Sequence, residues 1–234
     1  MNIIGIIPAR GGSKGIPQKN LRELNHLPLI SYTIKSAKKS KMINRIIVST
    51  DNKKIASLAK KTGVEVPFIR PIKLATSKSK TLDVILHTLK FLEKNENYIP
   101  DIVVILQPTS PLRTEELIDS SINSLIHNKS TSVLSVKEVK THPFGSFIIN
   151  NRFLHPYKSN FTKYSRRQTY PKHFYPTGAI YTFWYSTIKK YGNYYGTKIF
   201  PLIHNDETNI DIDNEFDFFV AEMILKYWKK FQNK

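Results

Sequence analysis

Short apolar runs alternate with longer amphipathic segments along the first half of the chain. The runs contain many β-branched residues and no regular polar positions, as in strands covered on both faces. They comprise residues 3–7, 45–49, 66–69, 102–106 and 132–136. Residues 28–41, 53–62 and 82–93 carry apolar side chains at helical spacing. Asp51 and Asn52 are good caps for the second of these helices, and Thr114 is a good N-cap for another. This order predicts an α/β fold with an open, mostly parallel sheet and helices on both sides.

The sequence changes character near residue 139. Aromatic residues become frequent, and no acidic residue lies between Glu138 and Asp206. Residues 144–149 and 179–183 predict strands, and residues 199–203 predict a strand that returns to the main sheet. Asn214, with Asp217 three residues later, predicts the start of a last helix. We therefore expect one domain over residues 1–234, with a small lobe or dimerisation arm inserted at about 139–198.

Composition excludes several classes of protein. The chain has 234 residues, of which 40% are hydrophobic and 12% aromatic, and this excludes intrinsic disorder. It has no cysteine, which excludes disulfides and thiolate chemistry. No apolar run approaches the roughly 18 residues that a membrane helix needs, and the first run is too short for a signal peptide. We expect a soluble, cytoplasmic protein with no membrane partner.

The net charge of +18 suggests a polyanionic partner: nucleic acid, an acidic membrane surface or a phosphorylated small molecule. Most of the 36 basic residues are Lys, and they are spread along the whole chain. Base-reading proteins depend more on Arg, and no recognition module is evident. Compositional drift towards Lys, Ile and Asn accounts for most of the charge. A basic nucleic-acid-binding protein is the distant alternative, and we expect no nucleic-acid partner.

The strongest local motif follows the first predicted strand, where residues 8–20 are PARGGSKGIPQKN. Glycines allow backbone amides to approach an anion closely. Arg10, Lys14 and Lys19 add three cations within ten residues. The spacing matches neither the Walker A motif nor the dinucleotide-binding fingerprint. Because ligands of open α/β sheets bind at the carboxyl ends of strands, we expect a nucleotide-phosphate site here.

Two further motifs carry candidate chemistry. The fourth strand leads into QPTSPLR at residues 107–113, where Gln107 can both donate and accept, as sugar or carboxylate recognition requires. The competing interpretation is a plain connector in which Arg113 is a surface cation. Asp211 and Asp213, two residues apart, point the same way on an extended segment. Such a pair can hold Mg²⁺ together with substrate phosphates, although both residues could instead be ordinary acids before a helix.

The acid-free region contains a fourth candidate, Arg166-Arg167-Gln168 followed by YPTGAIY at residues 175–181. An Arg without nearby acids is suited to a carboxylate or phosphate on a ligand. A dimer interface would also be rich in Arg and aromatic residues. Both interpretations hold together if the site is completed across a dimer.

Taken in order, these segments resemble the acylneuraminate cytidylyltransferase family, the CMP-N-acetylneuraminic acid (CMP-sialic acid) synthetases and their legionaminate cytidylyltransferase relatives. The resemblance spans the whole chain. It rests on IPARGGSKGIPQKN (7–20), IVSTD (47–51), the residues around Arg70 and Leu74, LQPTSPLR (106–113), Arg167-Gln168, GAIY (178–181) and DIDNEFDF (211–218). It implies a Rossmann-like sheet of the nucleotide-diphospho-sugar transferase type and a homodimer. It also implies transfer of CMP from CTP to an acidic nine-carbon sugar, with Mg²⁺ and with release of pyrophosphate.

The resemblance also implies three groups of site residues. The nucleotide would meet Arg10, Gly11, Gly12, Ser13, Lys14, Lys19, Asn20, Arg70 and Thr81. The sugar would meet Gln107, Thr109, Arg167, Tyr181, Tyr194 and Tyr195, of which the last two would reach into the neighbouring subunit's pocket. Asp211 and Asp213 would bind the metal, and Arg10, Lys19 and Asp211 would be catalytic.

Three positions depart from the family pattern. Gly145 stands where several relatives have a cation near the sugar, and Thr177 replaces an Asn that commonly precedes GAIY. Ser77 replaces an acid in the loop after Leu74. In the family the first two positions lie near the acyl-sugar pocket, so the resemblance leaves open whether the sugar is N-acetylneuraminate or a di-N-acylated relative such as a legionaminate.

Overall fold

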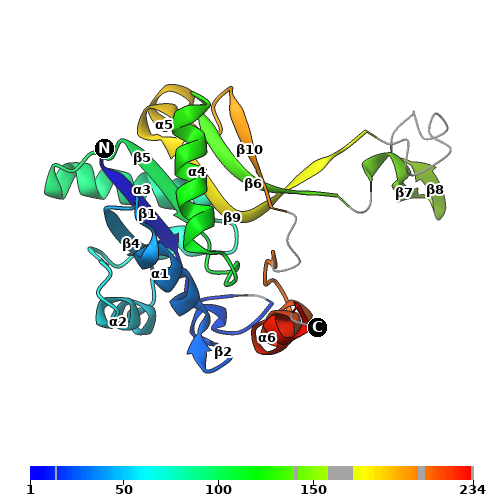
Figure 1. Cartoon of the computed structure of the whole chain (residues 1–234), viewed down its shortest axis with the longest axis horizontal. Coiled ribbons are helices and arrows are strands. Elements are labelled where there is room, and N and C mark those ends of the chain that lie inside the picture. The colour runs from blue at the N-terminus through cyan, green and yellow to red at the C-terminus, as the bar shows by residue number, and fades with distance from the viewer. Residues whose placement is uncertain (14, 140–141, 158–170, 205–208, 233–234) are drawn as a thin grey trace.

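The centre of the protein is a six-stranded sheet with helices on both faces (Figure 1). This computed structural model describes residues 1–13, 15–139, 142–157, 171–204 and 209–232. The strand order is β10-β6-β9-β5-β1-β4. All neighbours are parallel except β9, which is antiparallel to both β5 and β6. The predicted mostly parallel sheet is therefore confirmed, with strands β1 (Ile3–Pro8), β4 (Arg45–Ser49), β5 (Ile102–Leu106), β6 (Ser132–Glu138), β9 (Phe174–Trp184) and β10 (Ile199–Ile203).

Two layers of buried apolar side chains fix the helices to the sheet. Along β1, Ile3 and Ile7 belong to one layer, whereas Ile4 and Ile6 belong to the other. Helices α1 (Leu29–Lys39), α2 (Lys53–Lys61) and α4 (Glu115–His127) cover the first layer. Helices α3 (Thr81–Glu96) and α5 (Tyr185–Tyr191) cover the second. The continuous apolar strands of the sequence are thus explained by burial on both faces.

The expected helix starts are present. The Asn52 side chain accepts hydrogen bonds from the backbone amides of Lys54 and Ile55, and the Thr114 hydroxyl accepts one from Leu117. Asn214 caps α6 (Glu215–Gln232), while the Asp217 carboxylate accepts from the Asn214 amide in return. This reciprocal pair is a capping box, as the spacing of Asn214 and Asp217 predicted.

A third apolar cluster joins the two ends of the chain. It contains Ile16 from the first loop, Leu24 from the short β2–β3 ribbon (Glu23–Leu24 and Leu27–Pro28), and Ile212 and Phe218 near the C-terminus. Ile16 and Ile212 are fully buried. The cluster therefore holds the residue 211–213 segment against the loop that follows β1.

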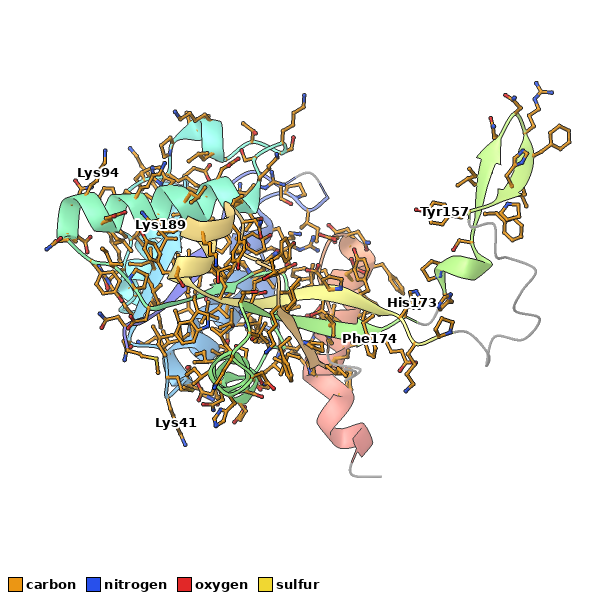
Figure 2. The ribbon with its side chains drawn as sticks, turned by 90° about the horizontal axis from the view of Figure 1, so that it is seen from above. Lys41, Lys94, Tyr157, His173, Phe174 and Lys189 are labelled. Carbon is orange, nitrogen blue, oxygen red and sulfur yellow. The ribbon has the colours of Figure 1, made fainter. Side chains whose placement is uncertain are left out.

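An antiparallel hairpin of β7 (Phe147–Asn150) and β8 (Phe153–Pro156) lies away from the main body, beyond the long ends of β6 and β9 (Figure 1). Figure 2 shows Tyr157 beside this hairpin and Phe174 where β9 leaves the body. Both β9 and α5 fall within the range expected as an inserted lobe, but they belong to the main body because β9 pairs with β5 and β6. Of the described residues between 139 and 198, those that project from the main body are the β7–β8 hairpin and the chain at its base.

Two strand predictions need correction. Residues 66–69 form no strand, because Pro67 cannot donate a ladder hydrogen bond. Only isolated bridges pair Glu65 with Ile47 and Ile69 with Thr50. The strand predicted at residues 144–149 begins instead at Phe147, after a 3₁₀ turn over Pro143–Gly145. The other described 3₁₀ turns are Lys19–Leu21 and Ile72–Leu74. Within the described ranges, no helix is both long and apolar enough to cross a membrane.

Candidate active site

A cavity of about 280 Å³ opens where β1 and β5 end. It brings together many of the residues predicted to bind nucleotide, sugar or metal, although they lie far apart in the sequence. Thr81 is the first residue of α3, so the amino end of a 16-residue helix faces the cavity and favours an anion there. The predicted site residues that line the cavity are Arg10, Ser13, Lys19, Asn20, Arg70, Thr81, Gln107, Thr109 and Asp213.

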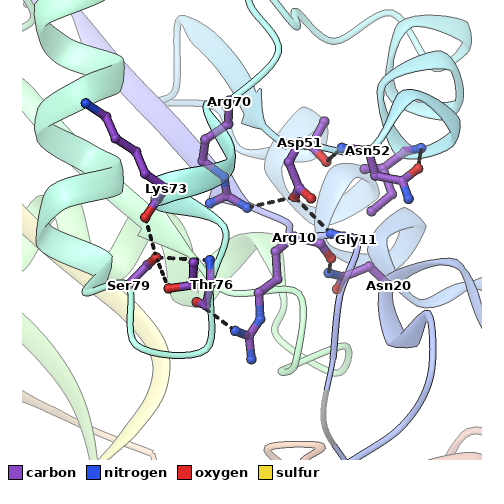
Figure 3. A network of polar contacts seen from close by, with 11 residues as sticks. Arg10, Gly11, Asn20, Asp51, Asn52, Arg70, Lys73, Thr76 and Ser79 are labelled. Atoms are coloured by element: carbon purple, nitrogen blue, oxygen red, sulfur yellow. Dashed lines mark hydrogen bonds and ion pairs between the residues drawn. The ribbon is translucent and has the colours of Figure 1, made fainter.

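Hydrogen bonds to neighbouring loops fix the start of the first loop (Figure 3). The Arg10 guanidinium donates to the backbone carbonyl of Thr76 at 3.0 Å, and the carbonyl of Arg10 accepts from the Asn20 side chain at 2.9 Å. The amide of Gly11, which was expected to bind a ligand anion, donates instead to the Asp51 carboxylate at 3.0 Å. A side chain at position 11 would clash, because its Cβ would lie 2.7 Å from Asn52 Nδ2. A Cβ at Gly12 would have no other atom within 4 Å, apart from those of its chain neighbours.

Asp51 also orders Arg70, which is only 4% exposed. Arg70 Nη2 lies 3.4 Å from Asp51 Oδ1 (Figure 3). Burial lowers the pKa of Arg70, and the nearby Asp51 carboxylate opposes this shift. Sequence reasoning missed Asp51, although its position directly after β4 places it at the ligand edge of the sheet.

Lys19 connects the first loop to the C-terminal acids. Its Nζ lies 2.5 Å from the carbonyl oxygen of Ile212 and 3.5 Å from Asp213 Oδ1. The amide of Ile212 donates to the carbonyl of Thr109 at 2.8 Å. Since the Ile212 side chain is fully buried, the two flanking acids are held at a fixed place beside the cavity.

Gly15 allows the first loop to approach this segment. A Cβ on Gly15 would lie only 2.2 Å from the carbonyl oxygen of Asp213, which no side chain can tolerate. The sequence predicted that the glycines of this loop serve an anion. At Gly15 the close approach is instead to the backbone of the protein's own C-terminal segment.

Burial and neighbouring acids disfavour the ionised form of Asp211. Burial raises the pKa of Asp211, and the nearby Asp213 and Asp217 add to the shift, while Thr109 and Lys19 oppose it. Part of the residue remains exposed to solvent, so these effects are partly screened. Among the described residues, no cluster of three or more His, Cys, Asp or Glu forms a metal site. Two carboxylates suffice for Mg²⁺ when substrate phosphates supply further ligands.

Arg113 is buried, so its interpretation as a surface cation is wrong. It is 4% exposed, and its Nη1 donates to the carbonyl oxygens of Gln107 at 3.0 Å and Ala179 at 2.8 Å. Burial lowers the pKa of Arg113 to about 9. Its motif gave no sign of this burial, because the contact with Ala179 crosses 66 residues.

The three predicted tyrosines pack together rather than line the cavity. The ring centroids of Tyr181 and Tyr194 are 5.5 Å apart, and those of Tyr194 and Tyr195 are 4.6 Å apart. Tyr194 also stacks on Phe183 of the same chain, at 5.8 Å. Burial raises the pKa of Tyr181 to about 12, to which the nearby charge of Asp211 contributes. The tyrosine cluster therefore lies beside the acid pair.

Two of the predicted site residues, Lys14 and Arg167, lie outside the described residues. Asp211 is not in the cavity wall, but it flanks the wall near Gly178. A Cβ on Gly178 would lie 3.4 Å from Asp211 Oδ2 and 3.9 Å from Gln107 Nε2. The carboxylate and the amide therefore converge on Gly178 of β9, where φ is +76° and the β6–β9 register is interrupted.

Comparison with known proteins gives consistent matches over most of the chain. A CMP-N,N'-diacetyllegionaminic acid synthase of Legionella pneumophila is 32% identical, covering 97% of both chains. An N-acylneuraminate cytidylyltransferase of Escherichia coli is 32% identical over 94% of this chain and 51% of its own length. The fold matches the structure of CMP:2-keto-3-deoxy-manno-octonic acid synthetase complexed with CTP, with a TM-score of 0.71 and 13% identity, covering 97% of this chain and 99% of the other. The cytidylyltransferase family model matches residues 4–226, and the chain therefore belongs to the cytidylyltransferase family.

Proposed function

We propose that the protein transfers CMP from CTP to an acidic nonulosonate, a nine-carbon keto-acid sugar, and releases pyrophosphate. The main support is that one cavity at the carboxyl edge of the sheet is lined by Arg10, Lys19, Gln107 and Asp213. The names of the relatives support CTP and a nonulosonate as the two substrates.

In the proposed reaction, the anomeric hydroxyl oxygen of the sugar attacks the α-phosphorus of CTP. The new P–O bond forms as the bond to pyrophosphate breaks, and the hydroxyl proton is released. Both reactants are anionic, so the site must reduce their repulsion and hold them in line. Arg10 and Lys19 line the cavity and are suited to hold the phosphates that leave as pyrophosphate. Arg70 and Thr81 extend this nucleotide half of the site.

Mg²⁺ is part of the proposal, and Asp211 and Asp213 are the residues that would hold it. The donor set fits, because Asp213 lines the cavity, and Asp211 lies close enough for burial and the Asp213 charge together to disfavour its ionised form. When bound, the ion would offset phosphate charge and polarise the α-phosphate. Lys19, held against the Ile212 carbonyl, keeps the acid pair aligned with the first loop.

The sugar half would be formed by Gln107 and Thr109, with Tyr181, Tyr194 and Tyr195 beside the acid pair and Arg167 meeting the sugar carboxylate. The Thr109 side chain lines the cavity beside the Asp211 carboxyl, whose pKa rise it opposes. The similar proteins include an N-acylneuraminate cytidylyltransferase and a CMP-N,N'-diacetyllegionaminic acid synthase. Their names support two candidate sugars, N-acetylneuraminate and a di-N-acylated legionaminate.

A homodimer is also part of the proposal. The β7–β8 hairpin exposes large apolar side chains far from the main body, among them Ile149, 78% exposed, and Phe153, 71% exposed. Exposed apolar surface of this kind marks protein–protein contacts. Ile149→Asp should convert a dimer into monomers in light scattering. A wild-type chain that is monomeric at micromolar concentration would contradict the dimer. We place the enzyme in the cytoplasm, where CTP is made.

The deciding assay mixes the protein with CTP, Mg²⁺ and a panel of N-acetylneuraminate, di-N-acylated nonulosonates and a neutral sugar, and measures pyrophosphate release. We expect pyrophosphate release with at least one of the acidic nonulosonates and none with the neutral sugar. Asp213→Ala should lose most of this activity and remain folded by circular dichroism. Folded wild-type protein that is inactive with every acid would refute the proposed function.

A further inference from the structure

The side chain of Arg113 ends inside the protein, at the point where two strands of the sheet separate. Strand β5 pairs with β9 from Ile102 opposite Trp184 to Leu106 opposite Ile180. In this register the next pair would be Gln107 opposite Ala179. That pair does not form, and the carbonyl oxygens of both residues instead accept from Nη1 of Arg113, at 3.0 and 2.8 Å. The guanidinium therefore replaces the last rung of the β5–β9 ladder.

The two carbonyls held by Arg113 belong to the segments that carry the converging polar groups of the site. Gln107 bears the side-chain amide, and Ala179 follows Gly178, the β9 residue beside which Gln107 Nε2 and Asp211 Oδ2 meet. Gly178 has a φ of +76°, which glycine can adopt without a steric penalty. Through one nitrogen atom, Arg113 thus binds both the Gln107 segment and the Ala179 segment.

No carboxylate pairs with Arg113 among the described residues. Its Nε and Nη2 atoms are buried and have no hydrogen-bond partner there. A buried cation without a counterion is costly, because the protein interior replaces its hydration poorly. A neutral side chain of similar volume would fill the space at less cost, so packing alone does not explain an Arg at this position.

We infer that Arg113 is a positioning residue for the sugar-acid half of the site: it holds β5 and β9 apart at Gln107 and Ala179, and so sets the place of the Gln107 amide. This inference rests on the proposed function. The nucleotide half contains Arg10, Arg70 and the amino end of α3. Its described residues form no hydrogen bond with the Arg113 guanidinium, whose acceptors are the Gln107 and Ala179 carbonyls, so CTP binding should be unaffected by the loss of that group.

The test compares Arg113→Met, which keeps most of the volume but cannot donate, with Arg113→Lys, which keeps the charge and can donate. Arg45→Met is the stability control, because Arg45 lies at the amino end of β4, away from the cavity, and pairs with Glu65 and Glu96. KM for the sugar acid and for CTP, and kcat, are measured for each protein well below its melting temperature. The dissociation constant of CTP is measured by calorimetry.

We expect Arg113→Met to raise KM for the sugar acid at least tenfold and to leave the CTP dissociation constant within twofold. Arg113→Lys should restore part of the loss, with a rise of about threefold. Arg45→Met should change neither constant. Equal losses for both substrates, or an unchanged KM for the sugar acid, would overturn the inference. If Arg113→Met does not fold, the selective threefold rise in Arg113→Lys decides.

A second measurement does not depend on catalysis. In ligand-free Arg113→Met, amide hydrogen exchange should quicken in peptides covering residues 102–110 and 176–184, and should stay unchanged in peptides of β1 and β4. Unchanged exchange in the first two peptides would contradict the positioning role. Absence of turnover in the wild type would refute the proposed function alone, since this exchange measurement still tests the role of Arg113.

Discussion

Replacing Gly15 with alanine tests whether the contact between the first loop and the C-terminal acids sets the catalytic geometry. The new Cβ would lie 2.2 Å from the carbonyl oxygen of Asp213, so the two backbones must separate by roughly 1 Å to reach an ordinary contact distance. The residue 211–213 segment is anchored by the buried Ile212 side chain and by the hydrogen bond from its amide to Thr109. We therefore expect the first loop to move, together with Lys19.

A displacement of about 1 Å within a reacting constellation can reduce the rate on the order of 100-fold. We expect Gly15→Ala to lower kcat by about this factor in the pyrophosphate-release assay. The strain should also cost about 1–3 kcal/mol of the free energy of unfolding, measured by urea denaturation. Gly63→Ala is the matched control, since Gly63 has a φ of +77° at the end of α2, far along the chain from the site. It should cost about 1 kcal/mol and leave kcat unchanged.

Two results would refute this reasoning. If Gly15→Ala keeps a kcat within twofold of the wild type, the close approach to Asp213 does not set the geometry. If Gly63→Ala loses as much activity as Gly15→Ala, the loss reflects stability alone. A crystal structure of Gly15→Ala would show directly whether the loop or the residue 211–213 segment has moved.

Four other expectations follow from the described contacts. Ile212→Ala should lower the free energy of unfolding by about 2–5 kcal/mol in urea denaturation, because it leaves a cavity in a closed apolar cluster; a loss below about 1 kcal/mol would contradict this. Asn52→Ala should cost about 1 kcal/mol in the same measurement, through the lost cap of α2, and no loss would disprove the cap's role. Folding raises the pKa of Asp211, so the protonated side chain stabilises the fold at low pH, and this stabilisation is lost as the pH rises through the folded-state pKa. Without metal, the melting temperature of Asp211→Asn relative to the wild type should therefore rise from pH 3 to pH 6, and a fall would mean that the pKa shift has the opposite sign. Arg10→Ala should raise KM for CTP at least tenfold and KM for the sugar less than threefold, and an equal rise in both would remove Arg10 from the nucleotide half.

Much of the fold follows from local sequence. Strands β1, β4, β5 and β6 were predictable because each is a short β-branched run between turn residues. The caps at Asn52, Thr114 and Asn214 were predictable because a cap depends on residues within three positions of it. The cavity residues of the first loop were predictable for a related reason, since the carboxyl end of a parallel strand is where ligands bind.

The tertiary structure decided whatever depends on contacts between distant residues. It made β9 an antiparallel strand of the central sheet rather than part of a separate lobe, because its pairing partners lie about 40 to 80 positions earlier. It placed Asp51 on the amide of Gly11, and Gly15 against the backbone of Asp213. It also buried Arg113 between two carbonyls. The sequence by itself identified which side chains carry charge and which glycines allow close approach, whereas only the packed chain determined what those groups meet, because hydrogen-bond geometry is set by atoms that the sequence keeps far apart.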